Sequence, residues 1–195
     1  MAIDLIPGFI RENYVIHETN HASAILQNDF ANEWTDIVEV LQQFRLYRSA
    51  VLTPGGRKSP ISEFVDSRLY RKGWAEKQFR TSIIVDDHEL ITPTHQIDCY
   101  KNRVAFEIEW NNKDPFFDRD LNNFRLLFDR GAISVGVILT RATELQGIFN
   151  ELGKGSSYGS STTHWQKLMP RIHGGGAGGC PVLALGITKS LYVED

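Results

Sequence analysis

Three acidic residues lie close together in one short segment, on either side of a polar turn. Asp98 precedes the turn Lys101-Asn102-Arg103, and Glu107 and Glu109 follow it with one residue between them. Because residues two apart on a strand share a face, the two glutamates point the same way, and a hairpin across the turn returns their strand beside Asp98. The spacing therefore predicts a cluster of three carboxylates.

Such a cluster suits a divalent cation of the magnesium type, which prefers oxygen ligands and is usually held by one or two carboxylates together with phosphate oxygens of a substrate. We expect Asp98 and Glu107 to supply the carboxylates and the carbonyl group of Ile108 to supply a further oxygen, with Mg²⁺ as the ion and Mn²⁺ as its substitute. The ion would polarise a phosphodiester and lower the pKa of an attacking water. Glu109 would accept a proton from that water or bind a second metal ion.

The same acids also have a plainer interpretation. Glu107 and Glu109 would be solvent-facing residues of a half-buried strand, paired with Lys101 and Arg103 across the turn. Spacing alone leaves both interpretations open.

The elements that must position these acids alternate between strands and helices. Val104, Phe106, Ile108 and Trp110 recur at every second position and predict a strand with one buried face. A helix is predicted over 118–128, and the continuous apolar run 133–139 indicates a buried strand parallel to the acidic one. The other predicted elements are a helix over 22–46 with a break near Asn28, a helix from a Ser59 cap and Pro60 to Lys72, a strand and its return over 79–91 in a continuous meander, a helix over 143–152 and a buried strand over 181–187.

Charge is distributed unevenly along the chain, although the formal net charge is only −3. No Asp or Glu occurs between Glu151 and Glu194, and this segment carries lysines, arginine and histidines among many Ser, Thr and Gly residues. Phosphate oxygens accept hydrogen bonds from hydroxyls, backbone amides and cations, whereas a carboxylate would repel them. The segment therefore predicts a polyanion partner, and a glycine-rich loop that merely lacks acids is the alternative.

Two segments carry side chains that can contact DNA. Asn111, Asn112 and Lys113 directly follow the acidic strand; Asn can pair with adenine N6 and N7, and Lys can donate to guanine O6 and N7. An Asx turn that caps the next helix is the alternative. The second segment is a hydroxyl-rich loop, for which a surface loop without DNA contacts is the alternative. Its expected DNA-binding residues are Lys154, Ser156, Ser157, Tyr158, Thr162, Thr163 and His164.

Length and composition favour one domain over residues 1–195, since 22.1 kDa fits a single hydrophobic core. No apolar run is long enough to span a bilayer, and the first nine residues lack a basic segment followed by an apolar one. The two cysteines, Cys99 and Cys180, have neither disulfide-framework nor zinc spacing. We therefore expect a cytoplasmic protein with no membrane segment.

A resemblance to a known family lies in the same residues. An Asp at a strand start, a turn, and acidic residues on the next strand, followed by a helix and a buried strand, resemble the PD-(D/E)XK nuclease core. The run Glu107-Ile108-Glu109-Trp110-Asn111-Asn112-Lys113-Asp114 is similar to the catalytic strand and following loop of type II restriction endonucleases of the BglII and BstYI family. The pieces 124–125, 162–165 and 179–181 are similar too, and the resemblance extends from about Trp74 onward.

The resemblance implies an α/β fold with a PD-(D/E)XK core, in which helices flank a central mixed β-sheet. It also implies a homodimer that cleaves both strands of double-stranded DNA at a short, GATC-centred palindrome, with Mg²⁺ at each active site. Asp98 and Glu107 would be metal ligands, and the 111–113 loop would contact bases. The helix over 22–46 is a candidate for the dimer interface, with an ordinary core helix as the alternative.

Two residues need separate mention. Glu76 is a candidate for the additional helix acid that many of these nucleases have. Glu109 stands where most members of the wider superfamily have Lys, which leaves the general base open, because a carboxylate cannot supply the positive charge of Lys. Two other functions also remain open: a structure-specific repair or recombination nuclease, and a DNA-binding protein in which the acids only hold the fold.

Overall fold

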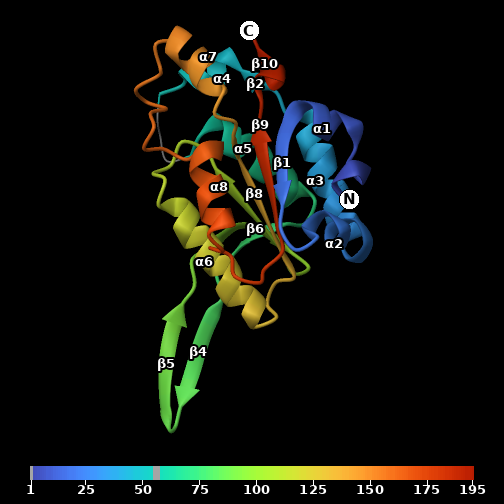
Figure 1. Ribbon diagram of the computed structural model, residues 1–195, viewed down its shortest axis with the longest axis vertical. Helices are drawn as coiled ribbons and strands as arrows, with labels where there is room; N and C mark the ends of the chain where they lie inside the picture. Colours follow the sequence, from blue (N-terminus) through green and yellow to red (C-terminus); the bar gives the residue numbers. More distant parts are fainter. Residues whose placement is uncertain (1, 55–57) are drawn as a thin grey trace.

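A six-stranded mixed sheet forms the centre of the computed structural model, which describes residues 2–54 and 58–195 (Figure 1). The strand order is β1-β9-β8-β7-β6-β3, with parallel pairing among β7, β8 and β9 and antiparallel pairing at both edges. The predicted parallel pairing of the acidic strand with the next buried strand is confirmed. The strands are β1 (Tyr14–Glu18), β3 (Ala75–Lys77), β6 (Ile97–Lys101), β7 (Val104–Glu109), β8 (Val135–Arg141) and β9 (Val182–Ile187).

Helices cover both faces of this sheet, so every residue of β7, β8 and β9 is buried, as parallel strands require. Alternate strand residues belong to two hydrophobic clusters: Phe106 and Val137 pack on the face covered by α3 and α5, whereas Ala105 and Ile138 pack against α6 and α8. The predicted mixed sheet flanked by helices is confirmed. The larger helices are α1 (Gly8–Asn13), α2 (Ala22–Asp29), α3 (Ala31–Gln43), α5 (Pro60–Arg71), α6 (Phe116–Asp129), α7 (Leu145–Glu151) and α8 (Trp165–His173).

Short elements complete the described chain. They are the 3-10 helices η1 (Ala2–Leu5) and η2 (Lys189–Leu191), the helix α4 (Arg48–Leu52), and the parallel pair β2 (Leu46–Tyr47) and β10 (Tyr192–Val193). None of the helices in the described ranges is long and apolar enough to cross a bilayer.

Local sequence signals place most helix ends correctly. Ser59 caps α5, since its Oγ accepts from the Ser62 amide at 3.0 Å and Pro60 occupies the first helical position. Gly131, with φ of +67°, follows α6 as the left-handed residue expected there. The predicted 22–46 helix is two helices that meet at Phe30. Helix α8 was not predicted, because Pro170 inside it disguises the helical pattern.

The prediction of a continuous meander over the middle of the chain is wrong. The strands β4 (Arg80–Val85) and β5 (His88–Pro93) pair as expected, but they form a separate ribbon that projects from the body of the protein (Figure 1). Thr94 closes its base, because its hydroxyl accepts from the amide of Phe79 and donates to the carbonyl of the same residue. With no second layer against it, the ribbon leaves the apolar residues Ile83, Ile84, Val85, Leu90 and Ile91 exposed. The apolar runs in its sequence therefore do not mark a buried strand.

Candidate active site

The β6–β7 hairpin places Asp98 and Glu107 side by side. The last pair of the ladder is Cys99 with Phe106, and extending its register by one residue sets Asp98 opposite Glu107. The Asp98 amide donates to Glu107 Oε2 at 3.2 Å, and the Ile108 amide donates to Asp98 Oδ2 at 3.0 Å. Each carboxylate therefore accepts from the backbone of the opposite strand. These bonds fix the orientation of both acids before any ligand binds.

Both glutamates are buried, which contradicts the solvent-facing interpretation. The exposed fractions are 0% for Glu107 and 1% for Glu109, and Glu107 Oε1 has no hydrogen-bond partner within the described chain. Lys101 does not pair with them, since its Nζ lies 2.8 Å from Asp36 Oδ2. An unpartnered carboxylate oxygen is costly to bury. Its presence marks a position where another group is expected to bind.

A fourth carboxylate, Asp120, reaches the cluster from α6. It is fully buried, and its Oδ1 accepts from Arg119 Nε at 2.9 Å. Arg119 Nη2 lies 2.8 Å from the same oxygen and 3.3 Å from Glu109 Oε1, so the guanidinium joins two acids of different elements. Sequence reasoning missed Asp120. The available signal was an acid in the apolar stripe of α6, directly beside Leu121 and one turn from Phe117 and Phe124.

Burial and mutual repulsion raise the pKa values of these carboxyl groups. Burial raises the pKa of Glu107 well above its usual value, and the charges of Asp120 and Asp98 add to the effect. Burial, again with the Asp120 charge, raises the pKa of Glu109 to about 9. For Asp98, burial raises the pKa although the Ile108 amide and Arg119 act against it. A cation bound at this cluster would release protons.

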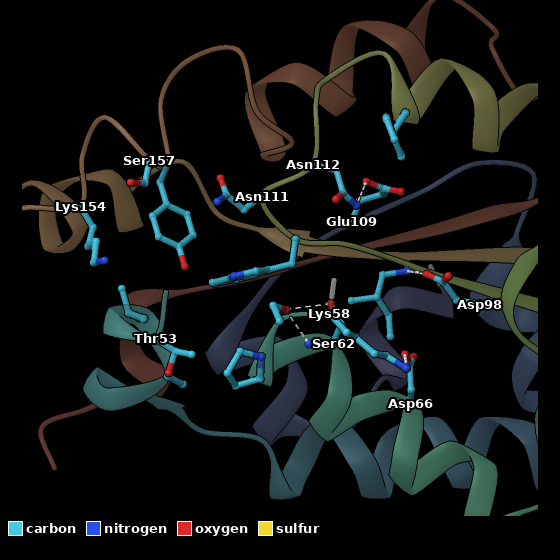
Figure 2. A pocket seen from close by; sticks show the side chains of 18 of the residues that line it. Thr53, Lys58, Ser62, Asp66, Asp98, Glu109, Asn111, Asn112, Lys154 and Ser157 are labelled. Carbon is cyan, nitrogen blue, oxygen red and sulfur yellow. Dashed lines mark hydrogen bonds and ion pairs between the residues drawn. The ribbon is translucent and has the colours of Figure 1, made fainter. Parts of the chain in front are cut away.

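A cleft of about 450 Å³ opens beside the acids (Figure 2). One wall comes from α5 and the segment before it, and the other from the end of β7 and two loops. Asp98 and Glu109 line the cleft, whereas Glu107 lies behind its surface. The structure therefore gathers the acids and parts of both predicted DNA-binding segments around one opening. The lining residues predicted from the sequence are Asp98, Ile108, Glu109, Asn111, Asn112, Lys154, Ser157 and Tyr158.

The two predicted DNA-binding segments are bonded to each other. The Thr163 amide donates to the Asn112 carbonyl at 2.8 Å, the Asn112 amide donates to Thr163 Oγ1 at 3.0 Å, and Lys113 forms a β-bridge with Thr162. The Asn112 side chain donates to Glu109 Oε2 at 2.8 Å (Figure 2). The Asx-cap alternative is wrong, because Pro115 stands at the start of α6 and no side chain caps it.

The predicted DNA-binding residues differ in exposure. Lys113, Ser156 and Ser157 are exposed, and Asn111, Asn112, Lys154 and Thr162 are half-buried. The buried members support the loop: Tyr158 stacks on Phe149, Thr163 accepts from Asn112, and His164 Nδ1 lies 3.4 Å from Thr143 Oγ1. Their contacts with DNA stay predictions.

The helix acid that faces Asp98 is Asp66, not Glu76. Glu76 lies in strand β3 rather than in a helix, is exposed, and accepts from Gln96 Nε2 at 2.6 Å. Asp66 lies in α5, is buried, lines the cleft and pairs with Lys58 (Figure 2). Placing Glu76 in a helix was therefore wrong. Asp66 precedes Asp98 by more than thirty residues, with the β4–β5 ribbon between them. Sequence spacing therefore gave no sign that the two acids lie close together in the fold.

Comparison with known proteins decides the class of the molecule. A family model described as Restriction endonuclease BglII/BglIII matches residues 14–187, which is most of the chain. The chain belongs to this BglII/BglIII family. None of the curated proteins compared with it matches. The endonuclease therefore has the α/β restriction-endonuclease-like fold and is a type II site-specific deoxyribonuclease acting on DNA. Membership confirms the resemblance and decides against both alternatives, the repair nuclease and the non-catalytic DNA-binding protein.

The donor groups of this endonuclease fit a hard divalent cation. In the described ranges no group of three or more Asp, Glu, His or Cys side chains is placed so that it could hold a metal ion by itself. A magnesium-type ion does not need such a group, because one or two carboxylates suffice when water and phosphate oxygens complete its shell. Asp98 at the cleft and the unpartnered Glu107 Oε1 supply oxygen donors of this kind.

Proposed function

We propose that this endonuclease is a Mg²⁺-dependent homodimer that cleaves double-stranded DNA at a short palindrome with a GATC centre. The observation that carries the proposal is the Asp98–Glu107 pair. Two carboxylates meet beside a cleft, Glu107 oriented by the Asp98 amide and Asp98 by the Ile108 amide, and one of their oxygens, Glu107 Oε1, is buried without a partner in the described chain. Nothing in the packing of the fold requires such an oxygen, whereas a cation would satisfy it.

Asp98 and Glu107, with the carbonyl oxygen of Ile108, are the residues that would hold Mg²⁺ or its substitute Mn²⁺. When bound, such an ion polarises the scissile phosphodiester and lowers the pKa of the attacking water. Asn112 and Arg119 hold both oxygens of Glu109 at the cleft surface. In that position its carboxylate can accept a proton from water or take part in binding a second ion.

The 111–113 loop is the proposed base-reading element, because it continues directly from the strand that carries the acids. A duplex placed for cleavage beside Glu109 brings base edges within reach of Asn111, Asn112 and Lys113. The β-bridge to the 162–163 segment holds this loop in place. We assign phosphate contacts to Lys154, Ser156 and Ser157, whose side chains are wholly or partly exposed. The GATC centre rests on the similarity of residues 107–114 to the BglII and BstYI strand and loop.

A homodimer follows from the proposed palindrome, because two active sites related by a two-fold axis match two symmetric half-sites. The helix pair over 22–46 is a weaker candidate for the interface than its sequence suggests. Helix α3 buries Trp34, Ile37 and Leu41 inside its own subunit, which supports the core-helix alternative.

Plasmid cleavage tests the proposal. Incubation with Mg²⁺ should give discrete fragments, and a chelator should prevent their formation. Sequencing the fragment ends then reads the recognition site and its centre directly. Cleavage in the chelator would contradict the metal requirement, and ends without a common palindrome would contradict the proposed site.

A further inference from the structure

The cleft brings an anionic substrate to a group of acids. Asp98, Glu107, Glu109 and Asp120 lie in one cluster, and the phosphodiester of DNA is itself negative. Opposing like charges in a partly buried site cost free energy, because water screens them poorly there. Further negative charge develops on the phosphate as the water attacks, and preorganised cations or donors are the usual means of stabilising it. The cluster therefore needs positive charge besides that of a metal ion.

Arg119 is placed to supply this charge. In the part of the chain that the structure describes, it alone forms an ion pair with Glu109 or Asp120. Its bonds to these acids use Nε and Nη2 and leave Nη1 outside them. The side chain is 31% exposed, and the residue lines the cleft. One edge of the guanidinium is thus anchored, Nη1 lies outside these bonds, and the residue borders the opening.

The anchor is rigid. Asp120 is fully buried and its Oδ1 contacts two nitrogens of the guanidinium, and the centroid of the Phe116 ring lies 4.2 Å from the Arg119 carbon Cζ. A planar guanidinium held on one edge presents its remaining N–H groups in a fixed direction, which suits recognition of phosphate oxygens.

Lys58, on the opposite wall of the cleft, forms ion pairs with other acids than those of the cluster. Its Nζ pairs with Asp66 (Figure 2). The same Nζ lies 3.6 Å from Glu63 Oε2. Lys154 lines the far end of the cleft, away from Asp98. Neither lysine contacts Glu109 as Arg119 does.

We propose that Arg119 is a catalytic residue, whose free guanidinium edge donates to a nonbridging oxygen of the scissile phosphate and offsets the charge that develops there. Asp120 is its positioning residue. The inference rests on the proposed function, because Asp98 and Glu107 define where the scissile phosphate lies.

The test combines Arg119→Gln with a change in the substrate. Single-turnover cleavage is measured with Mg²⁺ on a short duplex that carries the mapped site. Binding is measured in a chelator on the same duplex and on one with a neutral methylphosphonate at the scissile position. We expect cleavage to fall by on the order of 10²–10³. The ratio of affinities for charged over neutral DNA should fall by about tenfold, because a contact with a phosphate charge is lost. A merely structural role would not move this ratio.

Arg125→Gln is the matched control, since Arg125 lies on the same helix, is exposed and bonds only Asn122 among the contacts of its side chain described here. Arg125→Gln should retain both the wild-type cleavage rate and the wild-type ratio of affinities for charged over neutral DNA. An Arg119→Gln variant with a rate within about threefold of wild type, or with an unchanged ratio, would overturn the proposal. Failure of the wild type to cleave would instead refute the proposed function.

Removing Arg119 alone leaves Asp120 buried without its counter-charge, which can unfold the chain. If it does, Arg119→Gln/Asp120→Asn removes the pair together and is compared with Asp120→Asn. Relative to Asp120→Asn, the double variant should show the same fall in cleavage rate and in the ratio of affinities for charged over neutral DNA. Equal cleavage rates and equal affinity ratios for the two variants would overturn the proposal.

Discussion

At the scale of single residues, the site is built from carboxylates that would not be stable together on electrostatic grounds alone. Asp98, Glu107, Glu109 and Asp120 are compensated by backbone amides, one arginine and retained protons. This compensation is incomplete, because Glu107 Oε1 and Asp120 Oδ2 have no partner in the described chain. This arrangement is costly for the stability of the fold, and it is what the proposed cation site requires.

Asp98→Ala should abolish cleavage but not DNA binding. The substitution removes a proposed metal ligand, so the rate should fall by on the order of 10² or more, while affinity measured in a chelator persists. Single-turnover rates and a binding titration check both parts. Asp118→Ala, which removes an exposed acid of α6, is the control and should cleave normally. Retained cleavage by Asp98→Ala would refute its role.

The metal-free protein should lose stability as pH rises. The pKa of Glu109 is about 9 in the folded chain against an ordinary 4.5, so between these values the folded state holds a proton that the unfolded state has released. Stability from this group is complete below the lower value and is lost as pH rises through the upper one, with a slope of up to about 1.4 kcal/mol per pH unit. Urea unfolding in the presence of a chelator, repeated from pH 6 to pH 9, measures how the free energy of unfolding changes with pH.

Glu109→Gln should make that slope shallower, since the amide does not titrate. Glu151→Gln, at an exposed position of α7, should leave it unchanged. Equal slopes for Glu109→Gln and wild type would contradict the assignment of the effect to Glu109.

Among the secondary-structure elements, the β6–β7 hairpin and two loops, 111–113 and 154–164, contribute residues to the cleft beside the sheet. Strand β7 carries the acids and continues into the 111–113 loop, and the bridge between Lys113 and Thr162 ties this loop to the hydroxyl-rich one. Buried Arg141 of β8 donates to Tyr158 O and Thr162 Oγ1, which anchors the second loop to the sheet. Under the proposed function, the loops that read the substrate and the acids that act on it therefore share one support.

Lys113→Ala tests the loop as a reader of bases. The side chain is exposed and the bridge uses only its backbone, so stability should change little. Discrimination between the mapped site and single-base variants should fall by about 1–3 kcal/mol. Cleavage rates on both duplexes and a thermal melt measure the two effects. Lys189→Ala, in η2, is the control, and an unchanged discrimination would show that the loop is only structural.

At the scale of the whole molecule, the uneven charge matters more than the net value of −3. The acid-free stretch after Glu151 contributes Lys154 and Ser157 to the cleft, whereas the ribbon tip carries Asp86, Asp87 and Glu89, away from it. Polyanion binding is thus favoured on one part of the molecule and disfavoured on another.

A homodimer should sediment at about 44 kDa, twice 22.1 kDa. The homodimer should also cut both DNA strands in one binding event. Linear plasmid should therefore appear with little accumulation of the nicked circular intermediate. Mixing wild type with Asp98→Ala gives heterodimers with one working site, which should accumulate nicked circles. A 22 kDa species that still cuts both strands together would contradict the dimer.

The sequence by itself determined the features that depend on neighbouring residues. Period-two alternation and a polar turn specify the β6–β7 hairpin, and with it the pairing of Asp98 with Glu107. The Ser59 cap and Gly131 specify helix ends because their interactions span a few residues. The run 107–114 indicated the family.

Only the tertiary structure decided what covers each face. Arg119 and Asp66 line the cleft and Asp120 is buried beside Glu109 because of the way α6 and α5 pack on the sheet, and the rotation of a helix about its axis is set by its packing partners. The apolar residues of the 79–91 segment do not show that its ribbon lies outside the central sheet. Burial and proximity between distant residues are properties of the packed chain, which a local sequence pattern does not contain. They add Asp120 and Arg119 of α6 to the three acids that the hairpin sequence predicted.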